Sequence, residues 1–186
     1  MGHSGRFGTP GKVATMPEQK IAILDDNPDW VLDFAKDFNT EHTGQARITT
    51  IGYLTAPGRA DNYKTLIEPG TAGHDGIKAW TSDRFEFQWV GFWDLLAQHD
   101  LVLIDYDMGR VYFNGQAFLA DAVWDRATSD QRKKIRVYTS VGSLRQRVAS
   151  RFPGQSLNAE AYRSDGVIRV SIDVGPINFA DLCPGT

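Results

Sequence analysis

The stretch KIAILDDNPDWVLDFAKDF, residues 20–38, decides the fold class because the pattern of a strand changes to that of a helix within it. Residues 21–24 form a short apolar run, which is typical of a parallel strand covered on both faces. Asn27 and Pro28 offer a helix N-cap followed by proline at the first helical position. From Trp30 onward, aromatic side chains recur every four residues, which predicts one apolar stripe along a helix. The order is therefore strand, acidic turn, helix.

The rest of the chain repeats this alternation of strand and helix. Strands are expected at 46–54, 101–105, 134–140 and within 159–173, and helices at about 85–98, 118–123 and 143–152. Such alternation implies a mostly parallel sheet with helices on both faces. We therefore predict an α/β fold, namely a flavodoxin-like three-layer α/β/α sandwich with a parallel five-stranded sheet of order 2-1-3-4-5. The glycine-containing stretch at about 55–84 has no sustained period and is predicted to be an insertion between strands 2 and 3.

The composition fits one domain, because 186 residues, of which 41% are hydrophobic, can form one hydrophobic core but are too few for two cores of adequate size. We expect a flexible N-terminal segment over 1–19, one domain over 20–175 and a C-terminal tail over 176–186. A net charge of −3 gives no general attraction to nucleic acid or to a membrane surface. No apolar run approaches the ~20 residues of a membrane span. The single cysteine, Cys183, cannot form an internal disulfide, so we expect a cytoplasmic protein.

Carboxylates follow two of the predicted strands. Asp25 and Asp26 end the first strand, and Asp105 ends the apolar run 101–104. In the order 2-1-3-4-5 these strands are neighbours at the reversal of strand order, where ligands bind in such folds. Three carboxylates in one crevice repel each other unless a cation or protons neutralise them, and oxygen-only ligands suit Mg²⁺ better than zinc. The alternative, that these residues only form turns and cap helices, explains one of them well and three poorly.

Four segments, taken in chain order, resemble the receiver domains of two-component response regulators over about residues 20–165 once 55–84 is set aside. ILDDNPDW looks like the acidic-pair turn of that family, and LVLIDYDMGRVYFNG looks like its phosphoacceptor strand and loop. IRVYTS supplies the hydroxyl residue at the end of strand four, and NAEAY resembles the segment that carries the switch aromatic.

The resemblance implies a phosphorylation site that contains Mg²⁺. Asp105 would be the phosphoacceptor, forming an acyl phosphate from the phosphohistidine of a histidine kinase or phosphotransfer protein, or from a small phosphodonor. Asp26 and Asp105 would hold Mg²⁺, with the backbone carbonyl of Asp107 also in reach and Asp25 acting mainly through water. The protein would then be a phosphoacceptor in phosphorelay signalling rather than a turnover enzyme.

The resemblance also implies a switch, in which Thr139 hydrogen-bonds the phosphoryl group and Tyr162 follows it inward. An ordinary strand threonine and an ordinary packed aromatic are the alternatives. The chain departs from the family three positions after Tyr162, where Asp165 replaces the expected lysine. Arg163 or Arg169 would have to replace that lysine, although a planar guanidinium differs from a compact ammonium. Phosphorylation is therefore slow or unusual, or the fold survives as a pseudo-receiver.

The segment 131–159 contains seven basic residues and no acidic one. Because this region forms the output face of receivers, we expect a downstream partner protein there, with a solvated helix-and-strand edge as the alternative. No recognition helix or other nucleic-acid motif is present, so we expect no nucleic-acid partner. The sequence is also compatible with a homodimer.

Three functions follow from these patterns. The first is a receiver-like signalling protein whose output is protein–protein contact. The second is a haloacid dehalogenase-like phosphatase, since LIDYDMG also has the Asp-x-Asp form, but such enzymes place the nucleophile strand first and the acidic pair last, in reverse of this chain. The third is a pseudo-receiver that binds a partner constitutively, with 55–84 as a contact.

Overall fold

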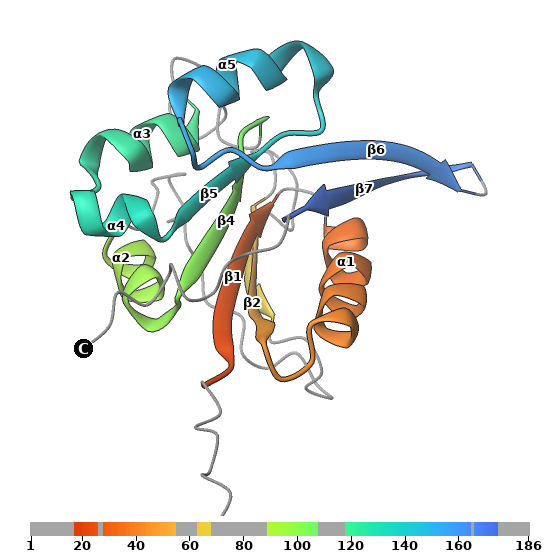
Figure 1. The fold of residues 1–186 in the computed structure, drawn as a ribbon, viewed down its shortest axis with the longest axis horizontal. Coiled ribbons are helices and arrows are strands. Elements are labelled where there is room, and N and C mark those ends of the chain that lie inside the picture. The colour runs from red at the N-terminus through yellow and green to blue at the C-terminus, as the bar shows by residue number, and fades with distance from the viewer. Residues whose placement is uncertain are drawn as a thin grey trace, which may run out of the picture.

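A central sheet of five strands organises the molecule (Figure 1). It is seen in a computed structural model, in which the described residues are 17–25, 28–54, 63–67, 89–107, 118–164 and 166–174. The sheet has the order β3-β2-β1-β4-β5. Its strands are β1 (Gln19–Asp25), β2 (Ala46–Leu54), β3 (Tyr63–Ile67), β4 (Leu101–Asp105) and β5 (Ile135–Tyr138).

Four of these strands run parallel, which confirms the predicted α/β class. β1 pairs in parallel with both β2 and β4, and β4 pairs in parallel with β5. Every residue of β4 is buried, as is β1 from Ile21 to Asp25, as expected for parallel strands covered on both faces. In chain order the parallel strands are arranged 2-1-3-4, which is compatible with a flavodoxin-like fold. The order reverses between β1 and β4.

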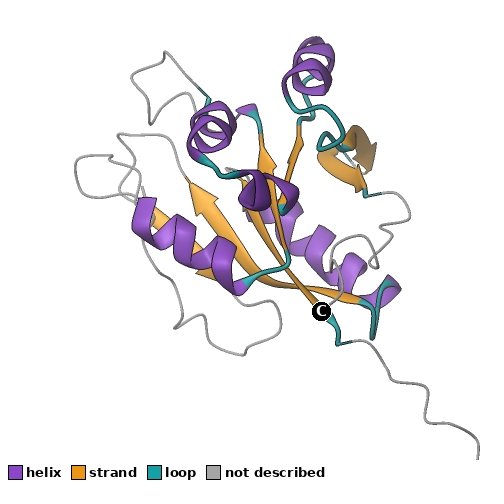
Figure 2. Ribbon diagram, turned by 60° about the vertical axis from the view of Figure 1, so that its left-hand side comes forward, coloured by secondary structure: helices purple, strands orange, loops and turns teal. Residues whose placement is uncertain are grey.

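Helices cover both faces of the sheet (Figure 2). One face is covered by α1 (Pro28–Glu41), whose buried Val31 and Phe38 share a core cluster with Ile23 and Leu103 of the central strands. The opposite face is covered by α2 (Trp89–Gln98), α3 (Leu119–Arg126) and α5 (Arg145–Arg151), which contribute to a second cluster. The short α4 (Ser129–Lys133) precedes β5, and the 3-10 helix η2 (Gly142–Leu144) precedes α5.

The fifth parallel strand expected within 159–173 is replaced by an antiparallel hairpin, β6 (Asn158–Ser164) with β7 (Val167–Asp173). On the side of β5 away from β4, the described part of the chain forms one isolated parallel bridge, between Val137 and Ser156, and then continues into the hairpin. In 158–173 polar and apolar residues alternate over much of the length, whereas a buried parallel strand needs a continuous apolar run. The hairpin lies over α1 (Figure 1) and adds Ala159 and Ile172 to the cluster on that face.

Part of the predicted insertion at 55–84 is described, and it is a strand. β3 lies within it and pairs antiparallel with β2 at the edge of the sheet. The other residues of 55–84 lie outside the described part of the chain.

Candidate functional site

Two of the predicted site residues, Asp25 and Asp105, end adjacent parallel strands at the same edge of the sheet. Leu24 of β1 pairs with Ile104 of β4, so the two aspartates occupy the next position on each strand. Because side chains alternate along a strand and Leu24 and Ile104 both belong to the cluster under α2, α3 and α5, both carboxylates face the α1 side. Asp25 is 2% exposed and Asp105 is 7% exposed. Two buried carboxylates therefore lie at the point where the strand order reverses, and this is where α/β sheets bind their ligands.

Asp25 is held by two neutral donors. The indole Nε1 of Trp30, in the first turns of α1, donates to Asp25 Oδ1 at 3.3 Å. The hydroxyl of Tyr138, the last residue of β5, donates to Asp25 Oδ2. The two aromatic rings meet edge to face, with centroids 5.9 Å apart. These donors offset the cost of burying a carboxylate, and they tie β1, α1 and β5 together at one point.

Asp105 lies between Asp25 and Tyr138 in the sheet. It pairs with Tyr138 across β4 and β5, and its Oδ1 accepts a long hydrogen bond of 3.4 Å from the backbone N–H of Asp107. Asp107 itself is exposed, as expected for a loop residue. Asp26, the other predicted Mg²⁺ ligand, lies outside the described residues.

The two residues predicted to form the switch lie in different surroundings. Thr139 follows β5, is 2% exposed, and its Oγ1 accepts a hydrogen bond of 3.1 Å from the backbone N–H of Val141. Tyr162 is 48% exposed on β6, across from Arg169 of β7, in a groove between the hairpin and α1. Arg169, one of the two residues considered as replacements for the missing lysine, pairs instead with Asp33 of α1.

The carboxylates offer the donor chemistry that Mg²⁺ takes, since Mg²⁺ binds one or two carboxylates and keeps several waters. Asp25 and Asp105 supply oxygen atoms from neighbouring strands at one edge of the sheet. Within the described ranges there is no group of three or more histidine, cysteine, aspartate or glutamate side chains suited to a metal ion. Asp25 and Asp105 are therefore the described side chains that would contribute to an Mg²⁺ site.

The basic side chains of 131–159 make contacts within the molecule. Arg147 and Arg151 of α5 pair with Asp121 of α3, and Arg151 also pairs with Asp125. Lys134 donates to the backbone carbonyl of His99 at 2.9 Å. These contacts join α5 to α3 and β5 to the end of α2, so several of the charges are partly neutralised internally. An output partner at this surface stays a prediction.

A buried polar cluster around His99, which lies just before β4, was not predicted. His99 is 6% exposed, and its Nδ1 lies 2.8 Å from the carbonyl oxygen of Leu95. Its Nε2 lies 2.9 Å from the hydroxyl of Thr50. The neutral ring satisfies both contacts if Nδ1 carries the proton, and burial lowers the pKa of His99 below its usual value of 6.5. His99 therefore joins α2 to β2 as a structural residue.

Comparison of the chain with protein-family models, with curated proteins and with solved structures gave no match. Among the described residues, no helix has the length and apolar character needed to cross a membrane.

Proposed function

We propose that the protein is a receiver-like signalling module with a flavodoxin-like fold, that Asp105 is its phosphoacceptor and that its output is contact with another protein. The observation that supports this proposal is the position of Asp25 and Asp105, which end neighbouring parallel strands where the strand order reverses. Carboxylates at this place can combine a nucleophile with a cation site, as phosphoryl transfer requires.

In the proposed reaction, one carboxylate oxygen of Asp105 attacks the phosphorus of a phosphohistidine. The P–O bond forms as the P–N bond breaks, and the imidazole leaves with the electron pair and takes up a proton. Asp25 would be kept in position by the donors Trp30 and Tyr138. Asp26 and Asp105 would hold Mg²⁺, with Asp25 acting mainly through water, and the ion would neutralise charge on the phosphoryl oxygens.

Intact-mass spectrometry after incubation with Mg²⁺ and a small phosphoramidate donor tests this proposal. We expect the mass of one phosphoryl group to be added to the wild-type protein and to be absent from Asp105→Asn. Asp94→Asn is the matched control, because it removes an exposed carboxylate on α2, away from the proposed site, and it should still be phosphorylated. An adduct that persists in Asp105→Asn would refute the assignment of the acceptor, and multiple turnover of a phosphoester would support the phosphatase alternative.

One observation favours a second candidate, a pseudo-receiver that binds its partner without phosphotransfer. Both oxygens of Asp25 already accept hydrogen bonds from buried protein groups, which stabilise this carboxylate without a cation. The sequence also has Asp165 where the family's lysine is expected. Under this candidate, the wild-type protein acquires no adduct, and its Trp fluorescence does not change when Mg²⁺ is added.

A further inference from the structure

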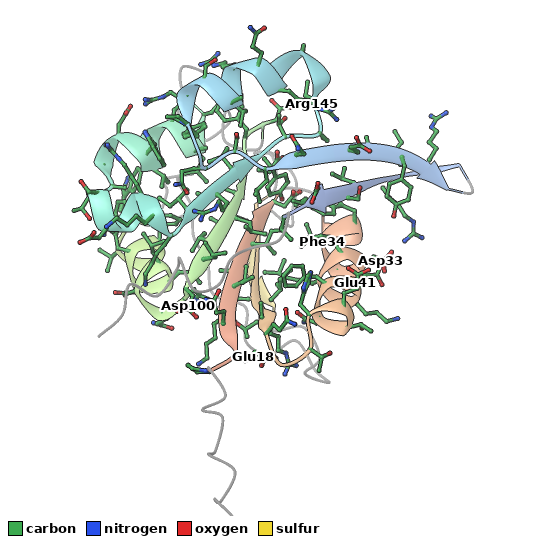
Figure 3. The ribbon with its side chains drawn as sticks, in the orientation of Figure 1. Glu18, Asp33, Phe34, Glu41, Asp100 and Arg145 are labelled. Carbon is green, nitrogen blue, oxygen red and sulfur yellow. The ribbon has the colours of Figure 1, made fainter. Side chains whose placement is uncertain are left out.

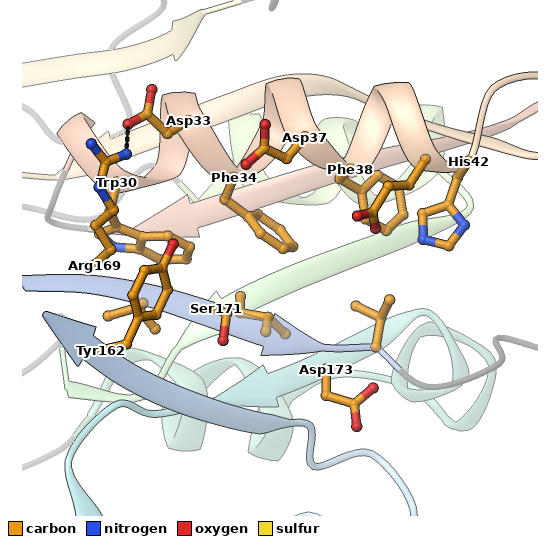
Figure 4. A pocket seen from close by; sticks show the side chains of 14 residues that line it. Trp30, Asp33, Phe34, Asp37, Phe38, His42, Tyr162, Arg169, Ser171 and Asp173 are labelled. Atoms are coloured by element: carbon orange, nitrogen blue, oxygen red, sulfur yellow. Dashed lines mark hydrogen bonds and ion pairs between the residues drawn. The ribbon is translucent and has the colours of Figure 1, made fainter. Parts of the chain in front are cut away.

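A groove of about 370 Å³ lies between α1 and the hairpin β6–β7 (Figure 4). Its α1 side carries aromatic rings, and its hairpin side carries Val170, Ile172 and the half-exposed Tyr162. The volume falls within the range of about 300–1,000 Å³ that is typical of ligand-binding clefts. The groove is distinct from the carboxylate edge, although Trp30 contributes to both.

One wall of the groove is a row of aromatic rings along α1. Trp30, Phe34, Phe38 and His42 are spaced four residues apart, so they lie on one side of the helix. Successive ring centroids are 5.6, 5.9 and 4.4 Å apart. Trp30 and Phe38 are buried, whereas Phe34 and His42 are partly exposed. Phe34 and His42 are therefore the rings of this row that are accessible from the groove, and they pack against the buried rings of Trp30 and Phe38.

A row of carboxylates runs beside the aromatic row. Asp33, Asp37 and Glu41 are also spaced four residues apart, and all three are exposed. Figure 3 shows Asp33 and Glu41 on the outer side of α1. Like charges at this spacing destabilise a helix slightly, so helix stability does not explain the row. Asp33 pairs with Arg169 of β7 across the groove (Figure 4). Asp37 and Glu41 take part in none of the ion pairs found in the described part of the chain.

We propose that this groove binds a short extended segment of a partner protein in which lysine or arginine side chains alternate with apolar ones. The carboxylates of Asp37 and Glu41 complement the cations, and the aromatic row takes the apolar side chains and the aliphatic stems of the basic ones. The exposed ring of Tyr162 can contact a cation through its face. The proposal does not depend on phosphorylation of Asp105.

The length of the groove fits such a segment. Between Trp30 and His42, α1 advances by about 18 Å, at about 1.5 Å per residue. An extended peptide covers this distance with about five or six residues, at about 3.3 Å each. Alternate side chains of such a peptide would point toward the aromatic row, and the long stems of the lysine or arginine side chains between them would allow their charges to reach the carboxylates beside the row.

Fluorescence anisotropy with a labelled hexapeptide of alternating leucine and lysine tests the proposal on the full-length protein. The double variant Asp37→Asn, Glu41→Gln keeps the size of both side chains and should weaken binding by about 2- to 30-fold, as expected for the loss of two exposed ion pairs. Asp94→Asn is the matched control, since Asp94 is an exposed carboxylate on α2, on the other side of the sheet. It should bind the probe as the wild type does. Tyr162→Ala should also weaken binding, with an unchanged circular dichroism spectrum.

Three results would overturn the proposal. The first is equal binding by the wild type and the Asp37→Asn, Glu41→Gln variant, and the second is equal binding of a probe in which glutamate replaces lysine. The third concerns the basic residues Arg6 and Lys12 of the chain itself. If Arg6→Gln, Lys12→Gln in the full chain tightens binding of the probe, the natural occupant is the protein's own N-terminal segment and not a partner.

Discussion

Replacing Tyr138 by phenylalanine removes a single hydroxyl group from a buried position at the end of β5. Tyr138 is 1% exposed, and its hydroxyl donates to Oδ2 of Asp25, which is 2% exposed. The ring contact with Trp30, nearly perpendicular at 88°, needs no hydroxyl. We therefore expect Tyr138→Phe to keep the fold and to lose only this hydrogen bond.

The free energy of unfolding should fall by about 1.5–3 kcal/mol, the range for a hydrogen bond to a charged group. Water cannot readily replace the lost donor, because both partners are buried. Trp30 Nε1 still donates to Asp25 Oδ1 at 3.3 Å. The carboxylate therefore keeps part of its stabilisation, and the larger cost of about 3–5 kcal/mol for a buried charge that loses its partner does not apply.

Urea denaturation followed by far-ultraviolet circular dichroism measures this change, with Tyr106→Phe as the matched control. The hydroxyl of Tyr106 donates to Oδ2 of Asp121 at 2.9 Å, and the Tyr106 ring is fully buried. Asp121 also pairs with Arg147 and Arg151, and its side chain is 16% exposed. Because this carboxylate keeps two cations and some access to water, Tyr106→Phe should cost only about 0.5–1.5 kcal/mol.

Two outcomes would refute this reasoning about Tyr138. One is a loss no larger than that of the Tyr106→Phe control. The other is additivity of Tyr138→Phe and Asp25→Asn in a double-mutant cycle, because residues that share a buried hydrogen bond should couple by about 0.5–3 kcal/mol. Either result would mean that Asp25 does not depend on the hydroxyl.

Three further predictions concern stability. Burial lowers the pKa of His99, so below pH 6.5 the unfolded chain takes up a proton at this residue more readily than the folded protein does. The contribution of His99 to the free energy of unfolding is therefore fully present above pH 6.5 and decreases as the pH falls below it. His99→Gln should reduce this dependence of the free energy of unfolding on pH, as measured by urea denaturation. Gly166→Ala should destabilise the hairpin by about 1–2 kcal/mol, because Gly166 has a φ of +82°. Gly142 has no positive φ and no close neighbour, so Gly142→Ala should be nearly neutral. Thermal unfolding compares the two variants. Gly52→Ala would place its Cβ against the buried Leu24 side chain and should cost about 1–3 kcal/mol in the same assay; an unchanged melting temperature would contradict the close packing of β1 on β2.

Local sequence patterns were sufficient to predict the central strands and α1. The predicted strand at 46–54 has the bounds of β2, and the run at 101–105 is β4. α1 begins at Pro28, as the proline at the first helical position indicates. Each of these elements carries its own periodicity, so its type can be predicted without knowing what it packs against.

The hairpin had a local signal that the prediction of a fifth parallel strand overlooked. Asp165 and Gly166 form a dipeptide that favours two-residue hairpin turns, and strand residues Ser164 and Val167 flank it directly. The alternation of polar and apolar residues on either side also indicated a half-exposed antiparallel pair rather than a buried strand. Because the chain turns back at this dipeptide, Tyr162 lies on an antiparallel hairpin over α1 and not on a fifth parallel strand of the sheet.

The sequence by itself determined the α/β class, the strand–turn–helix unit at 20–38 and the presence of acidic residues at strand ends, because these depend on spacing between near neighbours. Only the tertiary structure decided that Tyr138 donates to Asp25, a contact between residues separated by 113 positions. It also decided that the hairpin forms a groove with α1. Such contacts depend on strand register and on the packing of whole elements, and no local pattern in the chain encodes either.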